Sequence, residues 1–233
     1  MKAFVLAGGE GTRLKRYTYT VPKPMLLLAG KPILQYVLEN LRRCGVKEVI
    51  LTVSYQHEQI KEYFGDGKKF GMKITYSVEK TRMNTAGSIL QNKLDETFAV
   101  VMGDHLTNID VTDMARHHKK SGAIATIALY RDSTPLEYGV AEVKGDRITG
   151  FQEKPLLEHL YNTAIYVFEP EIYDYINPNE DFSKHVIPRL LTEKKKVNAY
   201  LFDDVWFDIG RVADYERLAD LFKVLKFAND LKI

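Results

Sequence analysis

The feature that most constrains this chain is an apolar run near its start that breaks abruptly into glycines. Residues 3–7 read Ala-Phe-Val-Leu-Ala, and such a short continuous apolar stretch predicts a buried strand. It is followed by a loop that contains Gly8, Gly9, Gly11, Thr12 and Arg13. Glycine lets the backbone turn and lets a ligand approach closely, and a guanidinium clamps phosphate oxygens. Because the backbone N–H groups of such a loop converge on an anion, the sequence predicts a polyphosphate site here.

Two common glycine motifs that also bind phosphate do not fit this loop. A Rossmann dinucleotide fingerprint requires a third glycine at the position where this chain has Leu14. A Walker A loop requires Ser or Thr after Gly-Lys, whereas Gly30-Lys31 is followed by Pro32. A second cation, Lys23, lies between two prolines that stiffen the backbone, and it is a further candidate phosphate ligand.

The bulk properties bound the compartment and the classes of partner. The chain has 233 residues, with 33 Lys and Arg against 31 Asp and Glu and a formal net charge of +2. This balance gives no reason to expect a nucleic acid or a membrane surface as the main partner. We find no apolar stretch of transmembrane length, and the first strand does not read as a signal peptide. The single cysteine, Cys44, fits a reducing compartment, so we expect a cytoplasmic protein.

Strands alternate with helices through the first half of the chain. The pattern predicts strands at residues 3–7, 49–53, 74–78 and 98–102, and helices at about 32–44, 56–64, 86–92 and 111–120. This spacing is typical of βαβ crossovers, which build a mainly parallel sheet with helices on both faces. Ligands of such sheets bind at the carboxyl ends of the strands, so Gly8, Glu79 and Asp104 should converge on one crevice.

The second half of the chain has a different pattern. It predicts strands at residues 123–130, 140–143, 148–153, 162–168 and 197–202, and helices at 171–176, 183–193 and 213–228. Because little helix separates the first of these strands, this half should be mixed or antiparallel and should form the second wall of the crevice. We therefore expect one α/β domain over residues 1–233, with a Rossmann-like half to about residue 110.

Two aspartates beside glycines are candidate metal ligands. Asp104 follows an apolar strand and Gly103, and Asp208 precedes Gly210 by two residues. A single Asp beside Gly most often caps a turn. Two such carboxylates in a chain with a glycine-rich phosphate loop favour a magnesium site instead, because Mg²⁺ prefers oxygen ligands next to phosphates.

These motifs closely resemble the signature of the sugar-1-phosphate nucleotidyltransferases. The matching segments are Leu-Ala-Gly-Gly-x-Gly-Thr-Arg-Leu at 6–14, Pro-Lys-Pro-Met at 22–25, Gly-Asp at 103–104, Glu-Lys-Pro at 153–155 and Trp-x-Asp-Ile-Gly at 206–210. They occur in the order of the family, and the resemblance runs from Phe4 to about Tyr215. The chain has no hexapeptide repeats of the kind that form a C-terminal β-helix, so it looks like a compact member of the family.

The resemblance implies which residues bind the nucleotide and the metal. The implied nucleotide-binding residues are Leu6, Ala7, Gly8, Gly9, Gly11, Thr12, Arg13, Lys23, Glu79 and Gly87. Asp104 and Asp208 would bind Mg²⁺, the expected cofactor. Arg13, Lys23 and Lys154 would serve catalysis by neutralising phosphate charge.

The resemblance also implies that the second half, from about residue 111, binds the sugar phosphate. Glu153 would accept hydrogen bonds from sugar hydroxyls and Lys154 would bind the phosphate, with Gly139 and Asn162 nearby. In a chain without the other motifs, Glu-Lys-Pro would read as an exposed charged turn.

Three positions depart from the family pattern. Arg16 replaces a proline, Asn84 replaces the glycine before Thr-Ala-Gly, and Ala164 replaces the glycine two residues after Asn162. The first bears on the shape of the phosphate loop, and the last bears on the local backbone and on the choice of sugar.

The resemblance implies transfer of a nucleotidyl group from an NTP to a hexose 1-phosphate, with release of pyrophosphate. The base and sugar stay open between glucose-1-phosphate thymidylyl- or uridylyltransferases and mannose-1-phosphate guanylyltransferases. A regulatory protein of the same fold that binds a nucleotide sugar without turnover is the alternative, and Leu14 argues against a Rossmann oxidoreductase. A homo-oligomer is compatible with the sequence.

Overall fold

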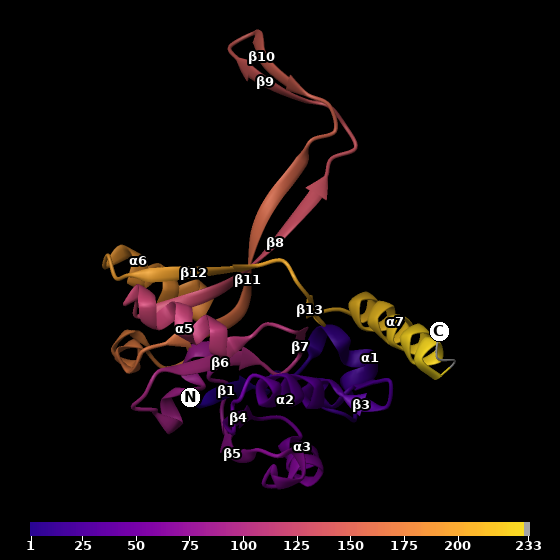
Figure 1. Cartoon of the computed structure of the whole chain (residues 1–233), viewed down its shortest axis with the longest axis vertical. Coiled ribbons are helices and arrows are strands. Elements are labelled where there is room, and N and C mark those ends of the chain that lie inside the picture. Colours follow the sequence, from indigo (N-terminus) through magenta and orange to yellow (C-terminus); the bar gives the residue numbers. More distant parts are fainter. Residues whose placement is uncertain (231–233) are drawn as a thin grey trace.

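The computed structural model describes residues 1–230 and is built around one seven-stranded sheet with the order β12-β8-β11-β6-β1-β4-β5 (Figure 1). The strands of this sheet are β1 (Ala3–Leu6), β4 (Glu48–Val53), β5 (Lys73–Val78), β6 (Phe98–Met102), β8 (Ala125–Pro135), β11 (Leu156–Phe168) and β12 (Val197–Phe202). Neighbours pair in parallel at β1–β4, β1–β6, β4–β5 and β8–β12, and antiparallel where β11 joins β6 and β8. The predicted mainly parallel sheet with a mixed second half is therefore confirmed.

The central strand β1 shows why continuous apolar runs form the middle of this sheet. All four of its residues are buried. Ala3 and Val5 belong to the core on one face, whereas Phe4 and Leu6 belong to the core on the other. Successive side chains of a strand point to opposite faces, so a strand that is covered on both sides must be apolar at every position.

Helices cover both faces of the sheet, as expected. The helices are α1 (Lys15–Thr18), α2 (Ile33–Arg43), α3 (His57–Phe64), α4 (Asn84–Gly87), α5 (Val111–Ser121), α6 (Ile187–Thr192) and α7 (Val212–Asp230). The first face carries α2, α3 and α5, and the second carries α4 and α6. None of the helices within residues 1–230 is long and apolar enough to span a membrane.

Short elements connect this framework. They comprise β2 (Leu27–Leu28), β3 (Lys31–Pro32), β7 (His105–Thr107) and β13 (Trp206–Asp208), the 3₁₀ turns η1 (Thr12–Leu14), η2 (Lys23–Met25), η3 (Lys68–Phe70), η4 (Leu90–Asn92) and η5 (Pro170–Tyr175), and the π-helix η6 (Phe182–Val186). The most consequential is the antiparallel pair β7–β13, which sets Asp208 opposite His105. A small third core that includes Leu14, Leu106 and Ile209 fixes the phosphate loop against this pair.

The helix that we expected at residues 86–92 is split into α4 and η4. The side chain of Ser88 hydrogen-bonds back to the carbonyl of Asn84, and the N–H groups of Ala86 and Gly87 donate to the carbonyl of Glu180. The carbonyl of a distant residue thus accepts hydrogen bonds from N–H groups in the first turn of α4, which have no acceptor within the helix.

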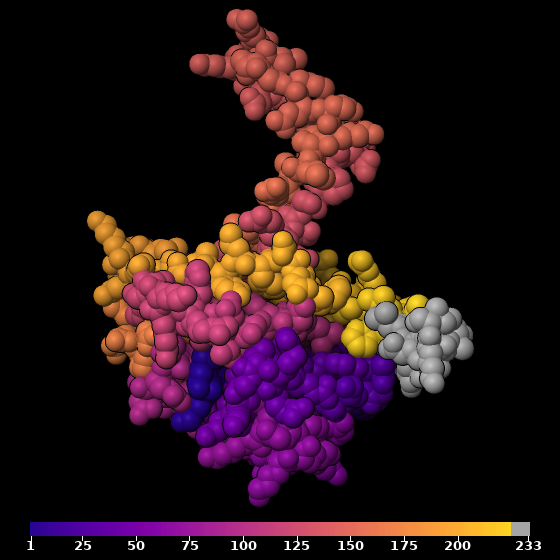
Figure 2. Space-filling model, in the orientation of Figure 1, coloured from indigo at the N-terminus to yellow at the C-terminus, as the bar shows by residue number. Residues whose placement is uncertain are grey.

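The second half carries a long antiparallel arm, residues 131–162, that leaves the body of the molecule (Figures 1 and 2). Its lower part continues the pairing of β8 with β11, and its tip is the hairpin of β9 (Val140–Lys144) and β10 (Arg147–Gln152). At the base of the arm the register shifts between Asn162 and Tyr166, which marks a β-bulge.

Candidate active site

The crevice at the carboxyl ends of β1, β5 and β6 holds a cavity of about 560 Å³, a size suited to a nucleotide-sized ligand. Eight residues that we expected at the site lie in its wall: Gly8, Gly9, Gly11, Thr12, Arg13, Lys23, Glu79 and Asp104. Gly210, next to the Asp208 segment, completes the wall on the far side. Gly8, Glu79 and Asp104, which follow three strands, therefore converge on one crevice as predicted.

Gly11 holds the phosphate loop in its turn. Its φ of +62° is a left-handed conformation, and a Cβ there would lie 3.0 Å from Thr18 Cγ2 and 3.1 Å from Lys23 Cβ. Thr18 in turn donates a hydrogen bond of 3.0 Å to the carbonyl of Gly11. At Gly9, by contrast, a Cβ would meet nothing within 4 Å, so this part of the loop is open to a ligand.

The two residues that precede the loop support it from behind. Leu6 lines a smaller adjoining cavity. Ala7 is buried, and its N–H donates to the carbonyl of Thr52. A Cβ added at Gly103 would lie 3.1 Å from the Cβ of Ala7. Ala7 therefore packs the ends of β1 and β6 together and is not itself part of the cavity wall.

A buried ion pair stands at the floor of the cavity. Lys23 is only 8% exposed, and its Nζ contacts Asp104 Oδ2. Asp104 Oδ1 is buried and makes no hydrogen bond within the part of the chain that the structure describes. A buried carboxylate oxygen without a partner carries a desolvation penalty, so Asp104 presents one unused ligand atom to the crevice.

His105 links the two aspartates that we predicted to bind metal. Its Nε2 lies 3.3 Å from Asp208 Oδ1 and 3.7 Å from Asp104 Oδ1. A hydrogen bond from His105 is the main cause that lowers the pKa of Asp208, and nearby cations add to it. Burial opposes the charged form of His105, but the hydrogen bond to Asp208 and the two carboxylate charges raise its pKa.

The donor atoms of Asp104, His105 and Asp208 all lie within 4.8 Å of one another, and these residues form the candidate metal cluster. Two carboxylates at a phosphate site suit a hard divalent cation. From the sequence we assigned His105 no catalytic role, because only the pairing of β7 with β13 brings it to Asp208.

Glu79 follows β5 and lines the crevice, and β1 and β4 separate that strand from β6, which precedes Asp104. It is 8% exposed, and its Oε1 has no hydrogen-bond partner among the described residues. Burial raises the pKa of Glu79, while the polar groups of the Ser88 side chain and of the Met83 backbone act in the opposite direction. The neighbouring cations Lys80 and Arg82 also line the cavity, and the sequence reading missed both.

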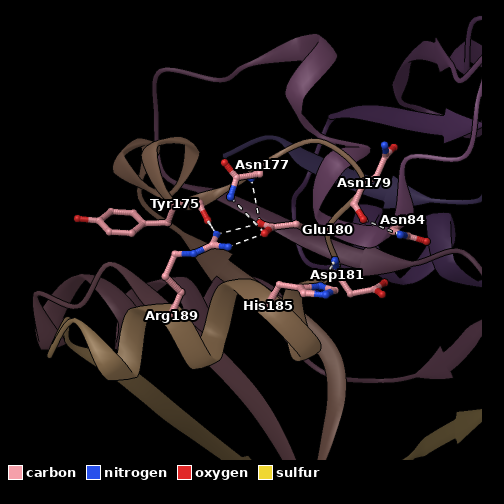
Figure 3. A network of polar contacts seen from close by, with 8 residues as sticks. All are labelled: Asn84, Tyr175, Asn177, Asn179, Glu180, Asp181, His185 and Arg189. Carbon is pink, nitrogen blue, oxygen red and sulfur yellow. Dashed lines mark hydrogen bonds and ion pairs between the residues drawn. The ribbon is translucent and has the colours of Figure 1, made fainter.

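A polar network fixes the loop of residues 84–87 (Figure 3), and Asn84 and Thr85 line the smaller adjoining cavity. Asn84 Nδ2 donates to the carbonyl of Asn179 at 2.7 Å, and Thr85 Oγ1 donates to Asp181 at 3.2 Å. A Cβ at Gly87 would lie 3.0 Å from the backbone nitrogen of Asn179. Gly87, expected at the nucleotide, is therefore buried under this segment, because only glycine allows so close an approach.

The residues expected at the sugar phosphate do not line the cavity. Gly139, Glu153 and Lys154 lie on the exposed arm, and Asn162 lies at its base. The arm does bring two of them together, since a Cβ at Gly139 would lie 2.7 Å from Glu153 Oε2.

Comparisons with known proteins identify the family of this chain. The family model described as nucleotidyl transferase matches residues 2–223. The chain is 37% identical over 240 residues to a UTP–glucose-1-phosphate uridylyltransferase of Synechocystis, covering 92% of this chain and 61% of that protein. It is also 37% identical over 219 residues to the D-glycero-alpha-D-manno-heptose 1-phosphate guanylyltransferase of Campylobacter jejuni, covering 92% and 97%.

The coverage differs between relatives. This chain spans about three-fifths of the length of the Synechocystis protein and nearly all of the Campylobacter protein. Among solved structures, HddC from Yersinia pseudotuberculosis matches with a TM-score of 0.75 at 24% identity, over 95% of this chain and 99% of that one, which supports the fold. Since the family model covers nearly the whole chain, the chain belongs to the nucleotidyl transferase family.

Proposed function

We propose that this chain transfers a nucleotidyl group from an NTP to a hexose 1-phosphate and releases pyrophosphate. The observation that carries the proposal is the convergence of the glycine loop, Arg13, Lys23 and Asp104 on one cavity. The printed names of the relatives, a uridylyltransferase and a guanylyltransferase acting on sugar 1-phosphates, support the same reaction class.

In this reaction an oxygen of the sugar phosphate attacks the α-phosphorus of the NTP. The new bond joins that oxygen to the α-phosphorus, and the bond to the bridging oxygen breaks as pyrophosphate leaves. The chain needs no covalent intermediate for this step. Its contribution is to hold the two phosphates in line and to neutralise their charge, with Arg13 and the loop N–H groups on the NTP side.

The candidate metal cluster fits Mg²⁺, because Asp104 keeps one buried carboxylate oxygen free of hydrogen bonds within the described residues. Asp104 and Asp208 would hold the ion. Bound there, it would draw negative charge from phosphate oxygens. His105 would orient Asp208 through the contact between Nε2 and Oδ1, and Lys23 would hold Asp104 in place.

Glu79 favours guanine as the base. A carboxylate accepts hydrogen bonds, and guanine presents two adjacent donors, N1–H and N2–H₂, on one edge. Uracil and thymine present one N–H between two carbonyl oxygens, which a carboxylate repels. Arg82 and Lys80 line the same cavity and could donate to the O6 acceptor of guanine. We therefore propose GTP as the preferred NTP.

The test is a matrix of four NTPs against hexose 1-phosphates, with magnesium and a pyrophosphate readout. GTP should give the highest kcat/KM, and Glu79→Gln should lower the preference for GTP over UTP at least tenfold. Turnover that prefers UTP or TTP would refute the choice of base. Tight binding of a nucleotide sugar in calorimetry, without turnover or pyrophosphate exchange, would refute the enzyme and favour the regulatory alternative.

A further inference from the structure

We propose that the arm of residues 131–162 enters the crevice of a second copy of this chain. Each active site would then combine the nucleotide-binding wall of one protomer with Glu153 and Lys154 of the other. This proposal rests on the function proposed above, because it explains how the sugar phosphate meets its cation.

The arm exposes large apolar side chains that no other part of the described chain covers. None of residues 131–162 is buried. Large apolar side chains along the arm, Tyr138, Val143, Ile148, Phe151 and Leu156, are each more than 60% exposed. A two-stranded ribbon without packing is marginally stable at best, so a ribbon that exposes these large apolar side chains calls for a partner surface.

The arm also carries a preassembled polar group. Gly139 packs directly against Phe151 and Glu153, where a Cβ would lie 2.5 Å from the ring and 2.7 Å from the carboxylate. Lys154 has a φ of +45°, a backbone conformation that residues other than glycine rarely adopt. Such backbone strain persists where the surrounding structure imposes it and is concentrated at functional sites. The segment between β10 and β11 is thus shaped to present Glu153 and Lys154.

Geometry prevents these residues from reaching the crevice of their own chain. Seven consecutive residues of β11, Leu156–Asn162, pair without interruption with β8. A strand of this length spans about 20 Å, and Lys154 lies beyond its far end. The near end is fixed, because the carbonyl of Thr163 lies 3.0 Å from Nδ1 of His105 in the candidate metal cluster.

A rigid swing of the arm about the bulge does not change this conclusion. Rotation about Thr163 keeps Lys154 about 20 Å from that residue, and therefore far from Asp104 and Asp208. The attacking oxygen of the phosphate that Lys154 binds must lie about 3–3.5 Å from the α-phosphorus at that cluster. Unless the β8–β11 ladder breaks, only another copy of the chain brings Lys154 to the reaction.

The rim of the crevice offers a matching surface. Tyr19 follows α1 and is 82% exposed, and Tyr55 follows the cavity-lining Ser54 and is 45% exposed. The hydroxyl of Tyr55 donates to the carbonyl of Tyr19, which holds the two segments together. When two copies associate, the aromatic rings at the rim of one crevice and the apolar side chains on the arm of the other copy would bury each other. Two copies related by a two-fold axis would bury both arms at once.

Sedimentation of the unliganded protein tests the association without any substrate. We expect a dimer. Leu156→Glu, on the arm, should weaken the dimer at least tenfold, whereas Leu191→Glu, at a similarly exposed position on α6, should leave it unchanged. A monomer, or a dimer that persists when Asn-Gly replaces residues 136–155, would overturn the proposal.

Mixing two inactive variants tests the shared site. Arg13→Ala disables the crevice and Lys154→Ala disables the arm. After subunit exchange at equal amounts, half of the dimers are mixed and each has one intact site of two, so activity should return to about a quarter of the wild-type value. Activity no higher than the mean of the two variants would overturn the shared site. An inactive wild-type dimer that depends on Leu156 would refute the proposed function but not the association.

Discussion

Replacing Glu180 by Gln tests how the wall of the crevice is held. The carboxylate of Glu180 accepts hydrogen bonds from Arg189 Nη1 at 2.8 Å and from the N–H of Asn177 at 3.0 Å, and it also contacts Arg189 Nη2 (Figure 3). The backbone carbonyl of the same residue accepts from Ala86 and Gly87 of α4. Glu180 thus anchors the segment that covers one side of the site.

The expected cost follows from the bonds that change. The side chain of Glu180 is 14% exposed, so water replaces little of what is lost. Glutamine keeps the shape and one acceptor oxygen but loses the charge, and a hydrogen bond to a charged group is worth about 1.5–3 kcal/mol against about 0.5–1.5 for a neutral one. We expect a loss of about 2 kcal/mol at neutral pH, which for a chain of this size lowers Tm by about 4–8 °C.

The pH dependence gives the sharper test. The hydrogen bond from Arg189 is the main cause that lowers the pKa of Glu180 from 4.5 to about 2. The unfolded chain therefore binds a proton at a higher pH than the folded chain. The stabilisation is complete above the unfolded pKa and is lost as the pH falls through the folded pKa. The difference between wild type and Glu180→Gln should be constant down to about pH 5 and should decline toward pH 2.

The assay is urea unfolding followed by circular dichroism at several pH values between 7 and 3. Glu171→Gln is the matched control, because Glu171 is exposed and forms no ion pair within the described part of the chain. Equal stability of wild type and Glu180→Gln at neutral pH, or a difference that does not change with pH, would refute the reasoning.

The remaining predictions concern the reacting groups and the base of the arm. Asp104→Asn and Asp208→Asn should each lower magnesium-dependent turnover by orders of magnitude with an unchanged circular dichroism spectrum, and near-normal turnover in both would exclude the metal assignment. Arg13→Ala should raise mainly the KM for NTP and Lys154→Ala mainly that for the sugar phosphate, by about tenfold to a hundredfold, and the opposite pattern would exchange the two subsites. Ala164→Gly should stabilise the fold by up to about 1 kcal/mol in urea unfolding, because it relieves a left-handed conformation worth about 1–2 kcal/mol at the cost of some chain entropy, and a loss of stability would contradict this account.

The sequence predicts the parallel half of the fold well because its strands are buried on both faces. The runs at residues 49–53 and 98–102 coincide with β4 and β6 to within one residue at either end. It does not predict the length of the ladder between β8 and β11. The exposed part of that ladder, from Arg131 onward, mixes charged, polar and apolar side chains without a period of two, since no core selects one face.

The candidate site divides in the same way. Gly8, Glu79 and Asp104 could be brought together from the sequence, because the carboxyl ends of parallel strands meet at one edge. His105 could not, because it reaches Asp208 only through a three-residue strand pair between segments about a hundred residues apart. The position of Lys154 could not be predicted either, because it depends on a bulge whose register the sequence does not reveal.

Two residues that depart from the expected family pattern have a left-handed backbone. Asn84 and Ala164 stand at positions where the family has glycine, and their φ angles are +54° and +56°. A left-handed backbone therefore occurs at both positions without glycine. Asparagine tolerates this conformation and gains the hydrogen bond from its Nδ2 to Asn179.

The side chain of Ala164 cannot form a hydrogen bond, so the β-bulge around Ala164 must hold its backbone in the left-handed conformation. The N–H of Ala164 donates to Asn162 Oδ1 at 2.9 Å, and Thr163 Oγ1 donates to the carbonyl of Ala128 at 2.8 Å. With both neighbours fixed, the carbonyl of Thr163 stays against His105. These bonds thus hold Ala164 in a conformation that glycine adopts more readily. Any effect on sugar choice must then come from the added methyl group, because the backbone already has the shape that glycine would allow.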